Sequence, residues 1–103
     1  MIKIVDNKKD AAKYIRSMED ILKKYHTIGA FREDLKVFFD DGEMIKLYEN
    51  SPVKKSLFRR NIISGVKIPD LAVELGLSPS RLYEIRREIL KELVAVFFRV
   101  IIL

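Results

Sequence analysis

The sequence predicts an all-α protein in which an N-terminal helical segment is followed by a trihelical unit with a long C-terminal helix. Apolar residues recur at intervals of three and four over most of the chain, which is the period of an amphipathic helix. Glycine, proline and serine stand where these periodic runs stop and restart, as they do at helix ends. With 103 residues, of which 49% are hydrophobic and 34% charged, the chain has the composition of one modest folded domain.

Residues 1–52 are predicted to form a helical segment that serves packing or association with a second copy. Residues 1–5 alternate in polarity and form either a frayed end or a short strand. Beyond them, Asp6 or Asn7 can cap a helix whose apolar residues follow a four-three-four-three spacing on one stripe. The members of this stripe are Ala11, Ile15, Met18, Leu22 and Tyr25, widened by Tyr14 and Ile21.

Residues 35–48 fit two structures. Helical spacing up to Asp40 favours a second helix, which we expect, whereas Asp41 and Gly42 between two apolar runs are typical of a hairpin turn. The acidic residues here lack the spacing and the terminal glutamate of a calcium loop. The sole histidine, His26, ends the first helix and has no cysteine or second histidine as a co-ligand. We therefore expect no metal site and no cofactor.

The trihelical unit is predicted for residues 53–103. Ser51 and Pro52 have the form of a helix start. The helix that follows supports the unit, because two short helices cannot enclose a core by themselves. Gly65 closes this supporting helix. Its inward-facing residues are Val53, Leu57, Phe58, Ile62 and Ile63.

Residues 68–92 have the form of a helix-turn-helix, with two helices joined by a tight turn and a basic second helix. Gly76 can adopt the left-handed conformation that ends the first helix, and Leu77 can pack back onto it. Ser78 can then accept a hydrogen bond from the next turn, and Pro79 fits the first helical position. The second helix has the buried stripe Leu82, Ile85, Ile89 and Leu93.

The apolar tail continues the register of this second helix to the end of the chain, because Val96, Val100 and Leu103 extend its buried stripe. A second stripe from Leu90 to Ile102 means that the helix must be covered on two sides. The tail is shorter than the roughly 20 apolar residues that span a bilayer, so we expect no membrane insertion. We expect it to pack against the N-terminal helices or against a second copy, and hence we expect a homodimer.

Charge is unevenly distributed along the chain, whose formal net charge is +5. Residues 1–52 contain ten Lys and Arg against ten Asp and Glu, whereas residues 53–103 contain ten against five. The whole excess lies in the half that carries the predicted helix-turn-helix. Such an asymmetry is typical of a surface that binds phosphates, and its simplest alternative is a solvated helix face.

Three blocks of this half resemble the C-terminal DNA-reading domain of RNA polymerase sigma factors and small sigma-like phage regulators. FRRNIISG, residues 58–65, resembles the end of the family's supporting helix, although Asn61 stands where an aromatic is usual. IPDLAVELGLS, residues 68–78, resembles the block in which Ala72 permits close helix crossing and a glycine makes the turn. SRLYEIRREILKEL, residues 80–93, resembles the recognition helix and its basic continuation.

This resemblance implies that one face of the second helix lies in the major groove of DNA. The base-reading residues that it implies are Ser80, Arg81, Tyr83, Glu84 and Arg87. Arginine can pair with guanine through two hydrogen bonds, glutamate can accept from cytosine, and tyrosine can reach a phosphate or a thymine methyl. Neighbouring basic residues are predicted to contact phosphates, which position a protein without reading sequence. They are Lys54, Lys55, Arg59, Lys67, Arg86 and Lys91.

We therefore expect a sequence-specific transcriptional regulator that binds double-stranded DNA. The alternative is an interaction module of the same fold that docks on RNA polymerase or on a phage DNA-packaging complex. An enzyme is not expected, because the sequence has no nucleophile with a base, no histidine–carboxylate pair and no phosphate-binding glycine loop. The absence of cysteine suits a reducing compartment, and we expect the cytoplasm.

Overall fold

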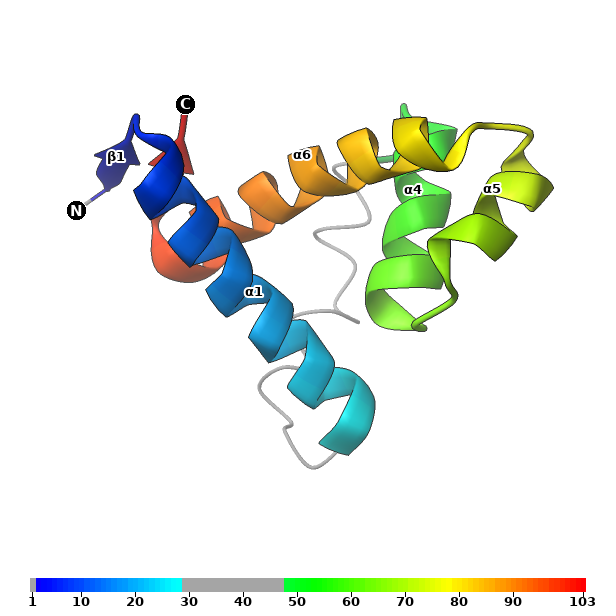
Figure 1. Cartoon of the computed structure of the whole chain (residues 1–103), viewed down its shortest axis with the longest axis horizontal. Coiled ribbons are helices and arrows are strands. Elements are labelled where there is room, and N and C mark those ends of the chain that lie inside the picture. Colours follow the sequence, from blue (N-terminus) through cyan, green and yellow to red (C-terminus); the bar gives the residue numbers. More distant parts are fainter. Residues whose placement is uncertain (1, 29–47) are drawn as a thin grey trace.

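The computed structural model describes the backbone of residues 2–28 and 48–103, and the side chains of residues 2–24 and 48–103. It is mainly helical. In Figure 1, α6 (Pro79–Phe98) runs across the molecule, with α4 (Pro52–Leu57) and α5 (Ile68–Leu75) at one of its ends and α1 (Lys8–Ile28) at the other. The predicted helix or hairpin at residues 35–47 lies outside the described residues. In chain order the elements are β1 (Lys3–Val5), α1 (Lys8–Ile28), α4 (Pro52–Leu57), the π-helix η2 (Phe58–Ile63), α5 (Ile68–Leu75), α6 (Pro79–Phe98) and β2 (Val100–Ile102).

The first helix, α1, forms as its apolar spacing predicts. Asn7 caps it, because its Oδ1 accepts a hydrogen bond from the backbone N–H of Asp10 at 2.8 Å. The helix continues to Ile28, two residues beyond the predicted end at His26. The predicted stripe is buried over its described part, which comprises Ala11, Ile15, Met18 and Leu22.

The prediction that the last helix continues to Leu103 is wrong. α6 ends at Phe98, and Arg99 takes the left-handed conformation with φ 54° and ψ 45°. Residues 100–102 are instead extended and pair in parallel with β1, so that the two ends of the chain lie side by side (Figure 1). Val100 remains buried, as its place in the predicted stripe required, but Val96 is 48% exposed.

The strand replaces the helix because β1 supplies backbone partners for it. The N–H of Lys3 donates to the carbonyl of Arg99 at 3.1 Å, and the N–H of Leu103 donates to the carbonyl of Val5 at 3.0 Å. The β-branched run at residues 100–102 also favours extended backbone. Of the two structures predicted for residues 1–5, the short strand is therefore confirmed.

The supporting helix begins at Pro52, as predicted, but its second half is a π-helix. The N–H of Ser64 donates to the carbonyl of Arg59, five residues back, at 3.2 Å. Gly65, with φ 76°, follows the end of this helix. Of the residues predicted to face inward, Leu57, Phe58 and Ile62 are fully buried, and Val53 and Ile63 are partly buried against the same core.

The turn between α5 and α6 has the local structure that the sequence predicts. Gly76 has φ 66°, and the N–H of Leu77 donates to the carbonyl of Ala72 at 3.1 Å, which together close α5. The Oγ of Ser78 then accepts a hydrogen bond from the N–H of Arg81 at 3.2 Å and caps α6. Three residues therefore separate the two helices and fix their relative direction.

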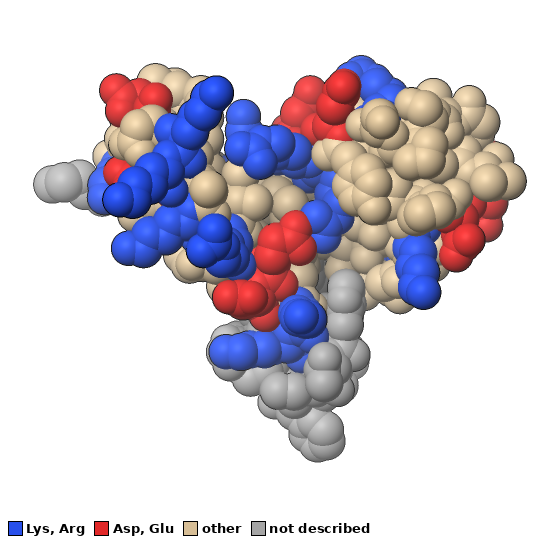
Figure 2. Space-filling view, viewed as in Figure 1, with Lys and Arg blue, Asp and Glu red and all other residues tan. Residues whose placement is uncertain are grey.

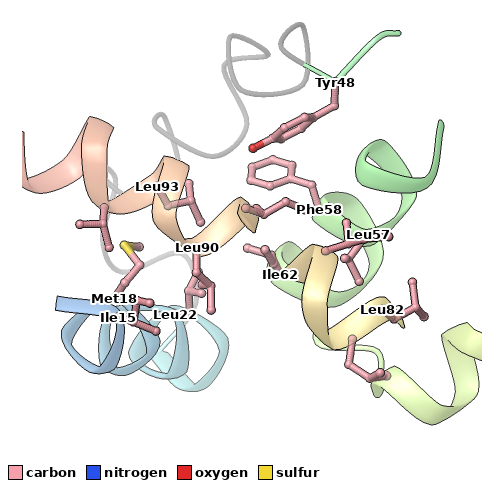
Figure 3. Close-up of a cluster of buried hydrophobic side chains, with 14 of the residues drawn as sticks. Ile15, Met18, Leu22, Tyr48, Leu57, Phe58, Ile62, Leu82, Leu90 and Leu93 are labelled. Atoms are coloured by element: carbon pink, nitrogen blue, oxygen red, sulfur yellow. The ribbon is translucent and has the colours of Figure 1, made fainter. Parts of the chain in front are cut away.

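A single core joins the N-terminal helix to the helices of the second half. Figure 3 shows Leu90 and Leu93 of α6 between Met18 of α1 and Phe58 of η2. The ring of Tyr48 packs against the ring of Phe58, with 5.7 Å between the centroids. Because α6 packs against α1 on one side and against η2 on another, the face of α6 that contacts neither element is the one exposed to solvent.

Candidate nucleic-acid interface

The five residues predicted to read bases lie together on the exposed face of the N-terminal half of α6. They are exposed because the opposite face, with Leu82, Ile85 and Ile89, is fixed in the core. Tyr83, at 54% exposure, is a large ring left open to solvent. The structure thus brings together on one helix face the whole predicted set, which is Ser80, Arg81, Tyr83, Glu84 and Arg87.

Arg81 is paired in this structure. Its Nη1 donates to Oε2 of Glu84 at 3.0 Å, and the two side chains are 55% and 66% exposed. An ion pair so open to water contributes only about 0 to 1 kcal/mol. Arg81 can therefore exchange Glu84 for an acceptor on a ligand at little cost.

Arg87 has no carboxylate partner within the described residues, and neither has Lys91 four positions later. Residues at this spacing are neighbours on a helix surface, and like charges there repel each other. The repulsion is relieved when an anion lies between the two side chains. Arg87 and Lys91 therefore form a cationic pair suited to a phosphate or an acceptor-rich base edge.

Arg86 was predicted to contact phosphates at the surface, but its guanidinium instead binds two side chains of the fold. Its Nη1 and Nη2 donate to the carboxylate of Glu19 on α1, the second at 3.0 Å, and its Nε donates to Oδ1 of Asn61 at 2.7 Å. Only 20% of the side chain is exposed. Asn61 in turn donates to the carbonyl of Val66 at 2.8 Å. Arg86 thus connects three parts of the fold, and we leave it out of the proposed DNA surface.

Lys54 is also used within the fold. Its Nζ lies 3.1 Å from Oε1 of Glu92 and 3.5 Å from Oε2 of Glu88. Burial opposes the charged form, but the hydrogen bond to Glu92 and the two carboxylates together raise the pKa of Lys54 above its usual value. Tyr48 donates its hydroxyl to the same Glu92, and burial followed by this bond raises the pKa of Tyr48 far above its usual value.

Tyr48, Glu92, Glu19 and Asn61 are residues that sequence reasoning did not single out as polar partners. Each makes its contact with a residue at least five positions away, and most contacts join different helices. Asn61 carried a signal, because it replaces the aromatic that the sigma-like pattern leads one to expect. An amide there accepts from the guanidinium and donates to a carbonyl, which the ring of a phenylalanine cannot do.

The other predicted phosphate contacts are available to a ligand. Lys55, Arg59 and Lys67 have no carboxylate partner in the parts of the chain that are described. Lys67 stands at the start of α5, which has no side-chain cap, and it lines an open groove of about 510 Å³ together with Tyr83. Pro69 has no N–H and Asp70 adds a carboxylate to the first turn of α5, so Lys67 itself is the feature of this groove that favours an anion.

Comparisons with protein-family models, curated proteins and solved structures give no match. The sigma-like resemblance therefore stays a prediction that depends on residues of this chain alone.

Two other kinds of site are absent from the described residues. No group of three or more His, Cys, Asp or Glu side chains among them is placed to hold a metal ion. None of the helices in residues 2–28 and 48–103 is both long and apolar enough to cross a membrane. The surface that remains as a candidate site is the exposed face of α6 with the cations beside it.

Proposed function

We propose that this chain is a sequence-specific DNA-binding transcriptional regulator, in which α5 and α6 form a sigma-like helix-turn-helix. The observation that carries the proposal is the exposed face of α6, where Arg87 and Lys91 lack a carboxylate partner among the described residues. The opposite face of α6 is fixed in the core, so the polar face is held in one orientation before any ligand binds. A rigid helix with such a face suits the major groove.

The proposed roles follow from chemistry and exposure. Arg87 and Arg81 pair with guanine, Glu84 accepts from cytosine or orients Arg81, and Tyr83 contacts a thymine methyl or a phosphate. Ser80 contacts either a base or the backbone. The cations that remain for phosphates are Lys55, Arg59, Lys67 and Lys91.

The proposed regulator binds as a homodimer. Two-fold symmetry would place two copies of α6 in successive major grooves, about 34 Å apart, on a pseudo-palindromic site. The site recovered from a random duplex pool with the purified full chain tests both statements at once. A single half-site would contradict the dimer without contradicting DNA binding.

The decisive experiment measures duplex affinity by fluorescence anisotropy as salt rises from 50 to 200 mM, for wild type and for the double variant Arg81→Ala with Arg87→Ala. We expect wild-type affinity to fall by orders of magnitude over this range and the variant to lose its sequence preference. Arg60→Ala is the matched control, because Arg60 is an exposed arginine already paired with Glu74 on α5. Affinity independent of salt would refute the proposal.

A second candidate function, a module that docks on RNA polymerase, is favoured by the apolar side chains that α5 and α6 expose. Val73 on α5 is 83% exposed, and an aliphatic side chain offers nothing to a phosphate. Figure 2 shows mostly uncharged side chains over the lobe formed by α5 and the start of α6. Val73→Glu should abolish binding to purified polymerase and spare DNA binding if docking is the function, whereas Arg81→Ala with Arg87→Ala should spare docking.

A further inference from the structure

The exposed side of α1 carries a second group of cations. Lys9, Lys13 and Arg16 are spaced by four and three residues, so they lie on one stripe of the helix. All three are exposed, and no carboxylate partner for them lies in residues 2–24 or 48–103. The equal numbers of basic and acidic residues in the first half of the sequence conceal this stripe.

This stripe lies about a quarter of a turn around α1 from Glu19, which binds Arg86 of α6. The contact between the two helices is therefore on a neighbouring side of α1. Arg86 is next to Arg87 in the chain, which brings α1 close to the cationic pair described above. Figure 2 shows basic side chains over α1 and, on the same face of the molecule, over the middle of α6.

The apolar side of α1 is unavailable to a lipid surface. Ile15, Met18 and Leu22 are 8%, 0% and 2% exposed, because they pack in the protein core. A helix that lies in a membrane interface inserts its apolar face, and over residues 8–24 this face of α1 is already packed in the core. What α1 presents is cationic and polar, which matches a nucleic-acid backbone better than a bilayer.

We propose that α1 is a second DNA-backbone contact, which binds phosphates of the duplex flanking the segment that α6 reads. The proposal rests on the proposed DNA-binding function and extends it to a longer footprint. Lys9 to Arg16 span about 10 Å along the helix axis. Phosphates of one strand follow each other about every 3.4 Å along the duplex axis, so the three cations have several phosphates within reach. Asp20 follows Arg16 by four residues on the same stripe, so a negative charge ends the cationic stripe at its C-terminal side.

The test compares the full chain with Lys13→Gln plus Arg16→Gln in the anisotropy assay at 50 to 200 mM salt. Each phosphate contact contributes about 0.9 to the slope of log affinity against log salt, so losing two should reduce the slope by about 1.8. The preferred sequence should stay unchanged, because phosphates carry no base information. Asp20→Asn should act in the opposite direction and tighten binding.

The matched control removes the same charge elsewhere, by Lys3→Gln plus Arg99→Asn. Lys3 lies in β1 and contacts Tyr14 on another side of α1. Arg99 directly precedes β2, and asparagine tolerates its left-handed backbone. This control should leave the slope unchanged, and thermal melting confirms that each variant is folded.

The outcomes separate the two proposals. If Lys13→Gln plus Arg16→Gln behaves like the control while Arg81→Ala plus Arg87→Ala loses sequence preference, α1 is no DNA contact and the proposed function stands. If only the α1 variant loses affinity, α1 binds DNA and the reading role of α6 is wrong. If wild type binds anionic vesicles through the α1 cations and does not bind duplex, both proposals fail.

Discussion

Replacing Arg86 should cost the fold more than any other single loss of an arginine in its described part. Arg86→Ala removes two hydrogen bonds to the carboxylate of Glu19 and one to Asn61. Breaking a buried ion pair costs about 3 to 5 kcal/mol, and breaking an exposed one about 0 to 1 kcal/mol. The side chains of Arg86 and Glu19 are 20% and 40% exposed, so solvent screens the pair in part and we expect a loss of about 2 to 3 kcal/mol.

Arg60 and Glu74 form a natural control for this magnitude. They too make a two-bond arginine–carboxylate pair between helical elements, here η2 and α5, but both side chains are open to water at 44% and 48% exposure. Arg60 holds the pKa of Glu74 below its usual value. Because water replaces the lost partner at such a site, Arg60→Ala should leave the free energy of unfolding unchanged within error.

Denaturant unfolding followed by circular dichroism measures both losses on the full chain, and for a domain of this size a loss of 2 to 3 kcal/mol should lower Tm by roughly 10 to 20 °C. Arg86→Lys keeps the positive charge and removes the planar guanidinium, so it separates the contribution of the hydrogen-bond geometry to stability from that of the charge. A lysine cannot make the planar two-bond contact with Glu19 and also reach Asn61, so it should recover little stability. Equal losses for Arg86→Ala and Arg60→Ala, or full recovery by lysine, would refute the assignment of Arg86 to the fold.

Three further predictions concern stability. Tyr48→Phe should cost about 1.5 to 3 kcal/mol by removing the hydrogen bond to Glu92. The pKa of Tyr48 is raised in the folded state, so its contribution is fully present below its unfolded pKa, about 10, and is lost as pH rises further. Urea unfolding on both sides of pH 10 should therefore show a steeper alkaline loss for wild type than for the variant. Gly76→Ala should cost about 1 to 2 kcal/mol, from left-handed strain alone, because an added Cβ meets no atom within 4 Å. Ser78→Ala should cost about 1 kcal/mol in the same assay, because the N–H of Arg81 loses its cap.

The features that the sequence predicted well are those set by neighbouring residues. The buried stripe of α1 and the turn from Gly76 to Pro79 depend on spacing and on conformational preferences within about one helical turn. The same holds for the exposed face of α6, because a helix that buries Leu82, Ile85 and Ile89 must expose the residues between them.

The features that sequence reasoning missed depend on contacts between distant residues. Val100 can be buried either as the next residue of the helical stripe or as part of a strand. The β-branched run at residues 100–102 favours extended backbone, and pairing with residues 3–5, which the local pattern does not predict, completes the strand. Arg86 looks like any surface arginine in sequence, since its partner Glu19 is 67 positions away. A helical pattern predicts which face is polar, but it does not predict which other helix crosses that face.

The contact between Arg86 and Glu19 gives the charge distribution a functional consequence. Without it, Arg86 would add a cation to the face of α6 and Glu19 would place an anion in the basic surface of α1. Their pairing neutralises the two charges and, with Leu90 and Leu93 in the core beneath, fixes the direction of α1 relative to α6. If both helices bind one duplex, the separation of their phosphate contacts is therefore set by the fold, and a protected DNA segment of constant length is expected whatever its flanking sequence. Glu19→Gln should weaken this link, so a footprint that becomes variable in length in that variant would support the coupling, and one that stays constant would contradict it.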